Sequence, residues 1–368
     1  MPFLSLSLYN FRNLKNDNIN LNFKEVFFVG ENGQGKSNLL EALYYSAYGS
    51  SFRTHSDSQI IKNLQQNFSL ISMYSNEKES LQRIKIIYDK KKSIEKNGKK
   101  IHDRKELVNT IPCVVFCHGD MEFATGEPEC RRFFIDQTLT MYDSVYLDDL
   151  RNYKKILKTR NLILKENKYE LLDVYDLQLV QRGLEIQKKR KKTVFQINEI
   201  FGKLYEEISG IEGVSVKYIP SWKEIDCDYG KRLPSQEELL KFLKEKQDQD
   251  KILGTTFYGP YKDKIIFVKD NKNFIQTAST GQCRLISLLL RVTQSVYYKR
   301  VTNIKPVLLM DDVMLELDPK KREKFTSMIP EYEQLFCTFL PGEPYENYKK
   351  STTKVYKIEN GEWSDEER

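Results

Sequence analysis

The sequence lacks the features that mark several large classes of protein. Only three of its 368 residues are histidines, and none stands near a cysteine at the spacing of a zinc finger. The six cysteines form no C-x-x-C pair, so buried free thiols in a reducing compartment are expected. No apolar run reaches the roughly 18 residues of a transmembrane helix. The opening MPFLSLSLYNFRN has neither the basic start nor the cleavage site of a signal peptide. A cytoplasmic protein without membrane contact is therefore expected.

Size and charge leave room for several functions. The chain is long enough for two domains, or for one large domain that carries an insertion. Hydrophobic residues make up 40% and charged residues 30% of it, which are the proportions of an ordinary folded protein. Subtracting 52 acidic from 59 basic residues gives a net charge of +7, which favours a polyanionic partner without requiring one.

The strongest local signal is the octet GENGQGKS at residues 30–37. Four of its positions fit the pattern G-x-x-x-x-G-K-[ST], in which backbone N–H groups and a lysine surround the phosphates of a nucleotide. The pattern needs a strand before it and a helix behind it. The apolar run at 26–29 is typical of a strand buried on both faces, and apolar residues recur at helical spacing from Leu39 until Gly49. A phosphate loop in its usual context is therefore predicted.

A phosphate loop also needs a carboxylate for magnesium at the end of a buried strand. Residues 307–310 read VLLM and are followed by two aspartates, which fits that requirement. The two carboxylates could divide the work, Asp311 holding Mg²⁺ directly or through water and Asp312 polarising the attacking water. The alternative is a core strand with a polar end.

A third motif is STGQCRLISLLLRV at residues 279–292. Ser279 occupies the N-cap position of a predicted helix, and the apolar residues that follow have the spacing of one buried face. A serine, a glycine and a helix N-terminus can together bind an anion. Any capped core helix would look the same.

The middle of the chain turns helical and strongly charged. Residues 130–205 predict two long helices, and the polar stretch KEKQDQDK at 244–251 closes the region before a strand at 265–268. The basic run 188–192 could contact DNA phosphates or form a solvated face. The lysines around Asn97-Gly98, a two-residue hairpin signal, could also touch DNA, although guarding an exposed edge strand is favoured.

Together these motifs resemble an ABC-type ATPase head of the SMC and Rad50 kind, and most closely the RecF family. The resemblance extends to NFRN at 10–13, NGQGKSNLLEALYYSAYGSSFR at 32–53, GEPECRRFFID at 126–136, GPYKDK at 259–264 and LLMDDVMLELD at 308–318. It implies an α/β fold with mixed sheets around a phosphate-loop core. Residues 1–122 and 255–368 would form the ATPase domain, and 123–254 an inserted, mainly helical arm without a long coiled coil.

The resemblance implies ATP and Mg²⁺ as cofactors and a role for each motif residue. Lys36 would contact the β and γ phosphates, Ser37 and Asp311 the Mg²⁺, and Asp312 would be catalytic. Further residues expected at the nucleotide are Gly30, Asn32, Gly33, Gly35 and Asn38 of the loop, Arg12, Asn13, and Asp318 of the D-loop. In the second copy of a homodimer, Ser279, Gly281 and Gln282 would contact this ATP, so that ATP would join the copies and slow hydrolysis would release them.

A protein of this kind would bind double-stranded DNA and single-strand/double-strand junctions as an ATP-bound homodimer. It would help RecR-like and RecO-like mediators load a RecA-type recombinase during recombinational repair and replication, with weak DNA-stimulated ATP hydrolysis. Its DNA contacts would be mainly to phosphates and hence salt-sensitive.

Three other functions can be compared with the sequence. A nuclease with an ABC head would need an additional cluster of metal-binding acids, and no such cluster with convincing spacing is evident. A transporter subunit would usually carry an L-S-G-G-Q type motif and a switch histidine, whereas this chain has Ser279-Thr280-Gly281-Gln282, and Thr338 after the corresponding strand, so the sequence disfavours it. An ATP-controlled dimeric scaffold would reach DNA only through a partner.

The chain departs from the family pattern at three places. His118-Gly119-Asp120-Met121 replaces the usual Pro-Glu-Asp-Leu, Leu315 replaces the D-loop serine, and Tyr261-Lys262 stands within the customary Gly-Pro-His-Arg motif. These changes bear on the rate of hydrolysis and its response to DNA rather than on ATP binding.

Overall fold

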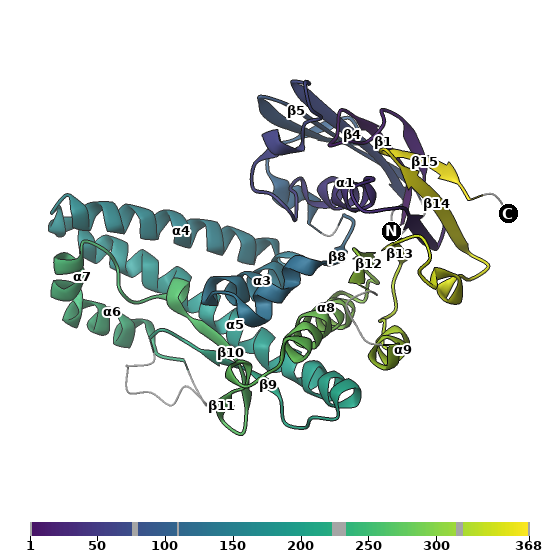
Figure 1. Ribbon diagram of the computed structural model, residues 1–368. Helices are drawn as coiled ribbons and strands as arrows, with labels where there is room; N and C mark the ends of the chain where they lie inside the picture. Colours follow the sequence, from purple (N-terminus) through teal and green to yellow (C-terminus); the bar gives the residue numbers. More distant parts are fainter. Residues whose placement is uncertain (1, 76–79, 109, 223–232, 314–318, 367–368) are drawn as a thin grey trace. The chain divides into compact units, whose positions relative to one another are not determined.

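The computed structural model describes residues 2–75, 80–108, 110–222, 233–313 and 319–366. The chain divides into two compact units (Figure 1). The first joins Met1–Asp120 to Leu290–Arg368, and the second is Met121–Leu289. The segment predicted as an inserted arm, 123–254, lies within the second unit, which also takes in residues 255–289.

The first unit contains a six-stranded sheet in the order β15-β14-β3-β13-β12-β8. Its strands are parallel except for β15. Every residue of the four adjacent strands β3, β13, β12 and β8 is buried, which explains why their sequences are mostly apolar. Because parallel strands end at the same edge, the residues that follow β3, β8, β12 and β13 meet there. The strands are β3 Glu25–Val29, β8 Cys113–Phe116, β12 Val307–Met310, β13 Gln334–Phe339, β14 Thr353–Glu359 and β15 Glu362–Asp365.

A second, antiparallel sheet in this unit has the order β2-β1-β4-β5-β6-β7. Helix α1, Lys36–Tyr48, shares one hydrophobic core with side chains from both sheets. The predicted hairpin at Asn97-Gly98 joins β6 to β7, and β7 is the edge strand, as the guard interpretation of its lysines requires. The strands are β1 Phe3–Tyr9, β2 Asn18–Asn20, β4 Asn67–Ser75, β5 Leu81–Asp89, β6 Lys91–Lys96 and β7 Lys99–Ile101. Helix α9, Pro319–Ser327, also belongs to this unit.

The second unit is mainly helical, and its two longest helices, α4 and α5, pack along each other (Figure 1). A three-stranded antiparallel sheet, β11-β10-β9, completes it. The helices are α2 Met121–Thr125, α3 Pro128–Thr140, α4 Ser144–Lys165, α5 Leu172–Ser209, α6 Gln236–Glu245 and α7 Gln247–Leu253, and the strands are β9 Ser215–Ile219, β10 Lys264–Lys269 and β11 Lys272–Asn273. Helix α8, Thr280–Thr302, starts in this unit and continues into the first.

The polar stretch 244–251 lies in α6 and α7, and α6 starts with a capping box between Ser235 and Glu238. The strand predicted at 265–268 is present as β10, and it pairs with β9 within the second unit. Within the described residues, no helix combines the length and apolar composition needed to cross a bilayer.

The basic run 188–192 does not form a single surface stripe. Arg190 is buried, and its guanidinium donates two 2.8 Å hydrogen bonds to Asp136 and one of 2.9 Å to Asp263. Lys189 pairs with Asp143 at 2.7 Å. A helix turns by about 100° per residue, so adjacent basic residues point in different directions. The basic run therefore contributes to the packing of α5 as well as to the charge of its surface.

Candidate nucleotide site

The predicted phosphate loop connects β3 to α1 at the edge where the parallel strands end. Gly33 and Gly35 have φ values of 78° and 119°, which favour glycine. At Gly30, a Cβ atom would lie 2.3 Å from the carbonyl oxygen of Ile358, so a side chain has no room. In the described part of the chain, the backbone N–H groups of Gly35, Lys36 and Ser37 donate to no other group. Such N–H groups at a helix N-terminus are suitable donors to a phosphate.

Lys36 lies inside the loop rather than in solvent. Its side chain is buried, and Nζ donates to the carbonyl oxygens of Gly30 at 2.7 Å and Glu31 at 3.1 Å. These neutral acceptors hold the ammonium group within the curve of the loop. A phosphate oxygen there would be a stronger, charged acceptor.

Ser37 and Asp311 meet although 274 positions separate them in the sequence. The Ser37 hydroxyl donates to Asp311 Oδ1 at 2.7 Å. Thr338 Oγ1 lies 3.2 Å from the same oxygen and 2.9 Å from Asp312 Oδ1, and it accepts a 2.8 Å hydrogen bond from Asp312 N–H. Thr338 belongs to β13 rather than following it, which corrects its predicted position. Parallel pairing of β12 with β13 brings the threonine beside both carboxylates.

The oxygens at this point suit a magnesium ion. Mg²⁺ prefers oxygen ligands and is commonly held by a hydroxyl, a carboxylate and phosphate oxygens. Burial raises the pKa of Asp311, and the neighbouring Asp312 adds to the rise, while hydrogen bonds from Ser37 and Thr338 oppose it. A cation would favour the ionised carboxylate and compensate for this burial. Ser37 and Asp311 are therefore the residues that fit the ion.

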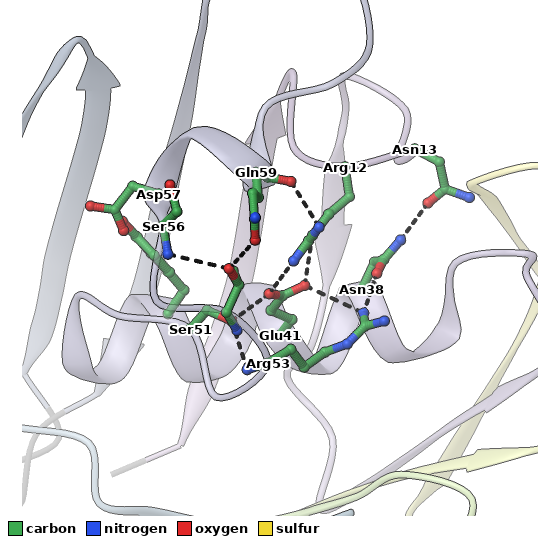
Figure 2. A network of polar contacts seen from close by, with 11 residues as sticks. Arg12, Asn13, Asn38, Glu41, Ser51, Arg53, Ser56, Asp57 and Gln59 are labelled. Carbon is green, nitrogen blue, oxygen red and sulfur yellow. Dashed lines mark hydrogen bonds and ion pairs between the residues drawn. The ribbon is translucent and has the colours of Figure 1, made fainter. Parts of the chain in front are cut away.

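Arg12 and Asn13 lie beside α1 in a network of polar contacts (Figure 2). Arg12 donates to both carboxylate oxygens of Glu41, at 2.9 and 2.8 Å, and Glu41 is completely buried. Asn13 Oδ1 accepts a 2.8 Å bond from Asn38 Nδ2. Arg53 donates to Asn38 at 2.6 Å and also reaches Glu41 at 3.4 Å. The predicted site residues Arg12, Asn13 and Asn38 are thus connected through two others. These are Glu41 and Arg53, which the sequence prediction had not included.

Glu343, after β13, was also missed by the sequence prediction. Burial raises the pKa of Glu343, and the charge of Asp312 raises it further, while Lys36 acts in the opposite direction. Its Oε2 accepts a 3.1 Å bond from Leu340 N–H. No motif marks this residue, because its proximity to the site depends on how the loop after β13 folds.

The S-x-G-Q motif begins α8 as predicted. Ser279 Oγ accepts from Gln282 N–H at 3.3 Å, and Gln282 Oε1 accepts from Ser279 N–H at 2.7 Å, which forms a capping box. The apolar stripe predicted behind the motif, Leu285, Leu288, Leu289 and Val292, is buried. Gly281 has no close neighbour at its Cβ position. Their predicted contact with a second copy's ATP stays a prediction, and Asp318 lies outside the described residues.

Other motif residues have structural partners. Asp120, in the segment that departs from the family pattern, accepts two hydrogen bonds from Arg291 at 3.1 and 2.7 Å. Arg131, in GEPECRRFFID, donates to the carbonyl oxygens of Ile265 and Gly126, both at 2.7 Å. Lys262, in GPYKDK, places its ammonium 3.8 Å from the centre of the Phe257 ring. These stretches support the fold of the units that contain them.

Comparisons with known proteins place the chain in a family. The family described as RecF/RecN/SMC N terminal domain matches residues 3–364. The DNA replication and repair protein RecF of Treponema pallidum is 44% identical over 358 residues, which cover 97% of this chain and 99% of the relative. The protein of the same name from Leptospira interrogans serovar Lai is 32% identical, with 97% of each chain covered.

Solved structures agree on the fold. A structure of the recombination mediator protein RecF-ATP in the RecFOR pathway superposes with a TM-score of 0.88 and 26% identity, covering 100% of this chain and 98% of the other. An Smc head bound to the C-winged helix domain of ScpA has a TM-score of 0.57 at 17% identity. The predicted ABC-type ATPase head with an inserted helical segment is confirmed, and no long coiled coil occurs among the described residues. The chain belongs to the RecF family of DNA replication and repair proteins.

Proposed function

We propose that this protein is an ATP-controlled DNA-binding protein of recombinational repair and replication. ATP would join two copies, the dimer would bind double-stranded DNA near single-strand gaps, and slow hydrolysis would reset it. Partner mediators resembling RecO and RecR, and a RecA-type recombinase, would act with it. The names of its relatives, which include a recombination mediator of the RecFOR pathway, support this pathway.

The contact between Ser37 and Asp311 carries the proposal. A hydroxyl from the phosphate loop and a carboxylate from a strand end lie 2.7 Å apart, beside backbone N–H groups at the start of α1. This arrangement suits a nucleotide whose phosphates are neutralised by Mg²⁺. Bound there, Mg²⁺ would supply charge neutralisation for the phosphates.

Each residue of the site would have a separate task. Lys36 would exchange its two carbonyl partners for phosphate oxygens, and the N–H groups of Gly35, Lys36 and Ser37 would bind the phosphates. Asp312 would orient the attacking water and accept its proton. Thr338, within hydrogen-bonding distance of both carboxylates, would hold them apart in fixed positions.

The test is sedimentation of the purified protein with a short duplex DNA, with and without ATP and Mg²⁺, at two salt concentrations. We expect a dimer only with ATP, and DNA that co-sediments with it less at the higher salt concentration. A protein that stays monomeric with ATP would contradict the proposal. A dimer that leaves DNA free would favour the scaffold that reaches DNA through a partner.

Asp312→Asn should leave ATP binding intact and slow hydrolysis by about a hundredfold or more, because an amide cannot accept the proton. The variant should therefore remain longer on DNA after excess competitor is added. The fold should tolerate the change, since Asp312 has a φ of 52° and asparagine adopts that conformation readily. Asp270→Asn is the matched control, because Asp270 is exposed and has a φ of 50°. Faster release of DNA by Asp312→Asn would contradict the catalytic assignment.

A further inference from the structure

The turn between β14 and β15 contacts the phosphate loop from the C-terminal end of the chain. Gly361 N–H donates to the carbonyl oxygen of Gln34 at 2.8 Å, and Asn360 N–H donates to the side-chain Oε1 of Gln34 at 2.5 Å. On its other side, the Gly361 carbonyl accepts from Lys15 N–H at 2.9 Å. The turn is thus bonded both to the loop and to the segment that carries Arg12 and Asn13.

These contacts fix the orientation of one peptide group. In a trans peptide the carbonyl and the following N–H point in opposite directions. Since Gly361 holds the Gln34 carbonyl outward, the N–H of Gly35 must point away from the turn. That N–H is one of the donors with no partner in the described chain. A loop that binds phosphate needs its carbonyl groups to point away from the anion. The turn holds the Gln34 carbonyl in that orientation.

The fit leaves no space for a side chain on the turn. Gly361 has a φ of 80°, and a Cβ there would lie 2.1 Å from the carbonyl oxygen of Asn13. The Cα of Gly361 is 3.4 Å from the position of a Cβ on Gly35. Both of these neighbours are backbone, which cannot move aside as a flexible side chain can. The position of the turn and the position of the loop therefore depend on each other.

We propose that Asn360-Gly361 is a positioning element of the nucleotide site, which orients the Gln34–Gly35 peptide so that Gly35 N–H faces the phosphates. The inference rests on the proposed function, because it assumes that the loop binds ATP. It assigns part of the ATP affinity to two residues near the C-terminal end of the chain that no nucleotide-binding motif includes.

The chain contains its own control for this idea. Asn97-Gly98 forms the same kind of two-residue turn, with φ values of 52° and 78° against 50° and 80° for Asn360-Gly361. Nothing lies within 4 Å of a Cβ placed on Gly98. Alanine therefore strains the backbone equally in both turns, but only Gly361→Ala meets other backbone atoms, those of Asn13 and Leu14, so that the turn must shift and loses its position against the phosphate loop.

The experiment measures ATP–Mg²⁺ affinity by calorimetry and thermal unfolding without nucleotide, for the unaltered protein, Gly361→Ala and Gly98→Ala. We expect Gly361→Ala to bind ATP about tenfold more weakly than Gly98→Ala, the loss of one hydrogen bond to a charged group. If Gly361→Ala does not fold, Gln34→Ala serves instead. It removes the acceptor of Asn360 N–H at an only half-buried site, and it should weaken ATP binding about threefold.

The outcomes separate the two proposals. If the unaltered protein binds no ATP, the proposed function is wrong and this inference fails with it. If the unaltered protein binds ATP and the two glycine variants bind it equally, only the inference is overturned. Where Gln34→Ala is used instead, ATP affinity equal to that of the unaltered protein overturns the inference in the same way. A lower unfolding temperature with unchanged ATP affinity would show that the turn merely supports the fold.

Discussion

Lys36→Ala is expected to weaken ATP binding by about tenfold to a hundredfold, and with it to abolish ATP-dependent dimers and DNA binding. Hydrogen bonds to a charged group contribute about 1.5 to 3 kcal/mol each, and about 1.4 kcal/mol corresponds to a factor of ten in affinity. Lys36 is the buried ammonium group of the loop, already held at the carbonyls of Gly30 and Glu31. Titration with ATP and sedimentation with duplex DNA measure the two effects.

Lys24→Ala is the matched control for this variant. Lys24 Nζ also donates to two carbonyl oxygens, those of Tyr332 at 2.9 Å and Glu333 at 2.6 Å. It precedes β3, whereas Lys36 follows it, so the two lysines flank the same strand at opposite ends. Lys24→Ala should bind ATP and DNA normally. Intact ATP-dependent DNA binding in Lys36→Ala would contradict the switch function.

Arg190→Met is expected to destabilise the second unit by about 3 to 5 kcal/mol, because it leaves the buried carboxylate of Asp263 and the partly buried one of Asp136 without their cation. Arg190 is the shared partner of Asp136 and Asp263, and Asp263 is fully buried. Denaturant unfolding can be followed through the fluorescence of Trp222, which is buried in this unit. A Trp363→Phe background removes the tryptophan of the first unit.

Lys244→Met, in the same unit, is the control for charge removal. Lys244 pairs with Asp173 of α5 at 4.0 Å, and both side chains are 74% exposed, so its loss should cost less than about 1 kcal/mol. Equal effects of the two substitutions would contradict the assignment of Arg190 as the centre of a buried network.

The destabilisation by Arg190→Met should depend on pH. Burial already raises the pKa of Asp263, although Arg190 lowers it. Without the arginine this pKa rises further, so the folded state binds a proton more tightly than the unfolded state does. The stability of the variant then falls as pH rises from the pKa of Asp263 in the unfolded state to its higher pKa in the folded state. The stability deficit should therefore be smaller at about pH 5 than at about pH 7.5, and a deficit independent of pH would contradict this cause.

Much of the nucleotide site could be predicted because its parts are local. Gly33, Gly35, Lys36 and Ser37 act within one strand–loop–helix connection, so their spacing is preserved in the sequence. The capping box of Ser279 and Gln282 is also local, and so is the turn at Asn97-Gly98. In these places neighbouring residues satisfy each other's hydrogen bonds or backbone requirements, and a motif is enough to predict the structure.

The basic run 188–192 shows where such prediction fails. In the sequence this run consists of five positively charged residues. Both interpretations, contact with DNA phosphates and a solvated face, placed them on the surface. The structure buries Arg190 because carboxylates from α3 and from the segment before β10 are available to it. Whether an arginine faces water or a buried acid depends on partners 54 and 73 residues away.

The sequence by itself determined the phosphate loop, the Asp-Asp strand end, the capped S-x-G-Q helix and the family to which they point. Each of these depends on interactions within a few residues, or on the apolar composition that a buried parallel strand requires. The tertiary structure alone decided three contacts. Ser37 donates a hydrogen bond to Asp311, Glu41 accepts from both Arg12 and Arg53, and Gly361 N–H donates to the carbonyl oxygen of Gln34. The Ser37 and Gly361 contacts depend on strand order, which brings the ends of distant segments to one edge of the sheet, while the Glu41 contact depends on how the segments beside α1 pack against it.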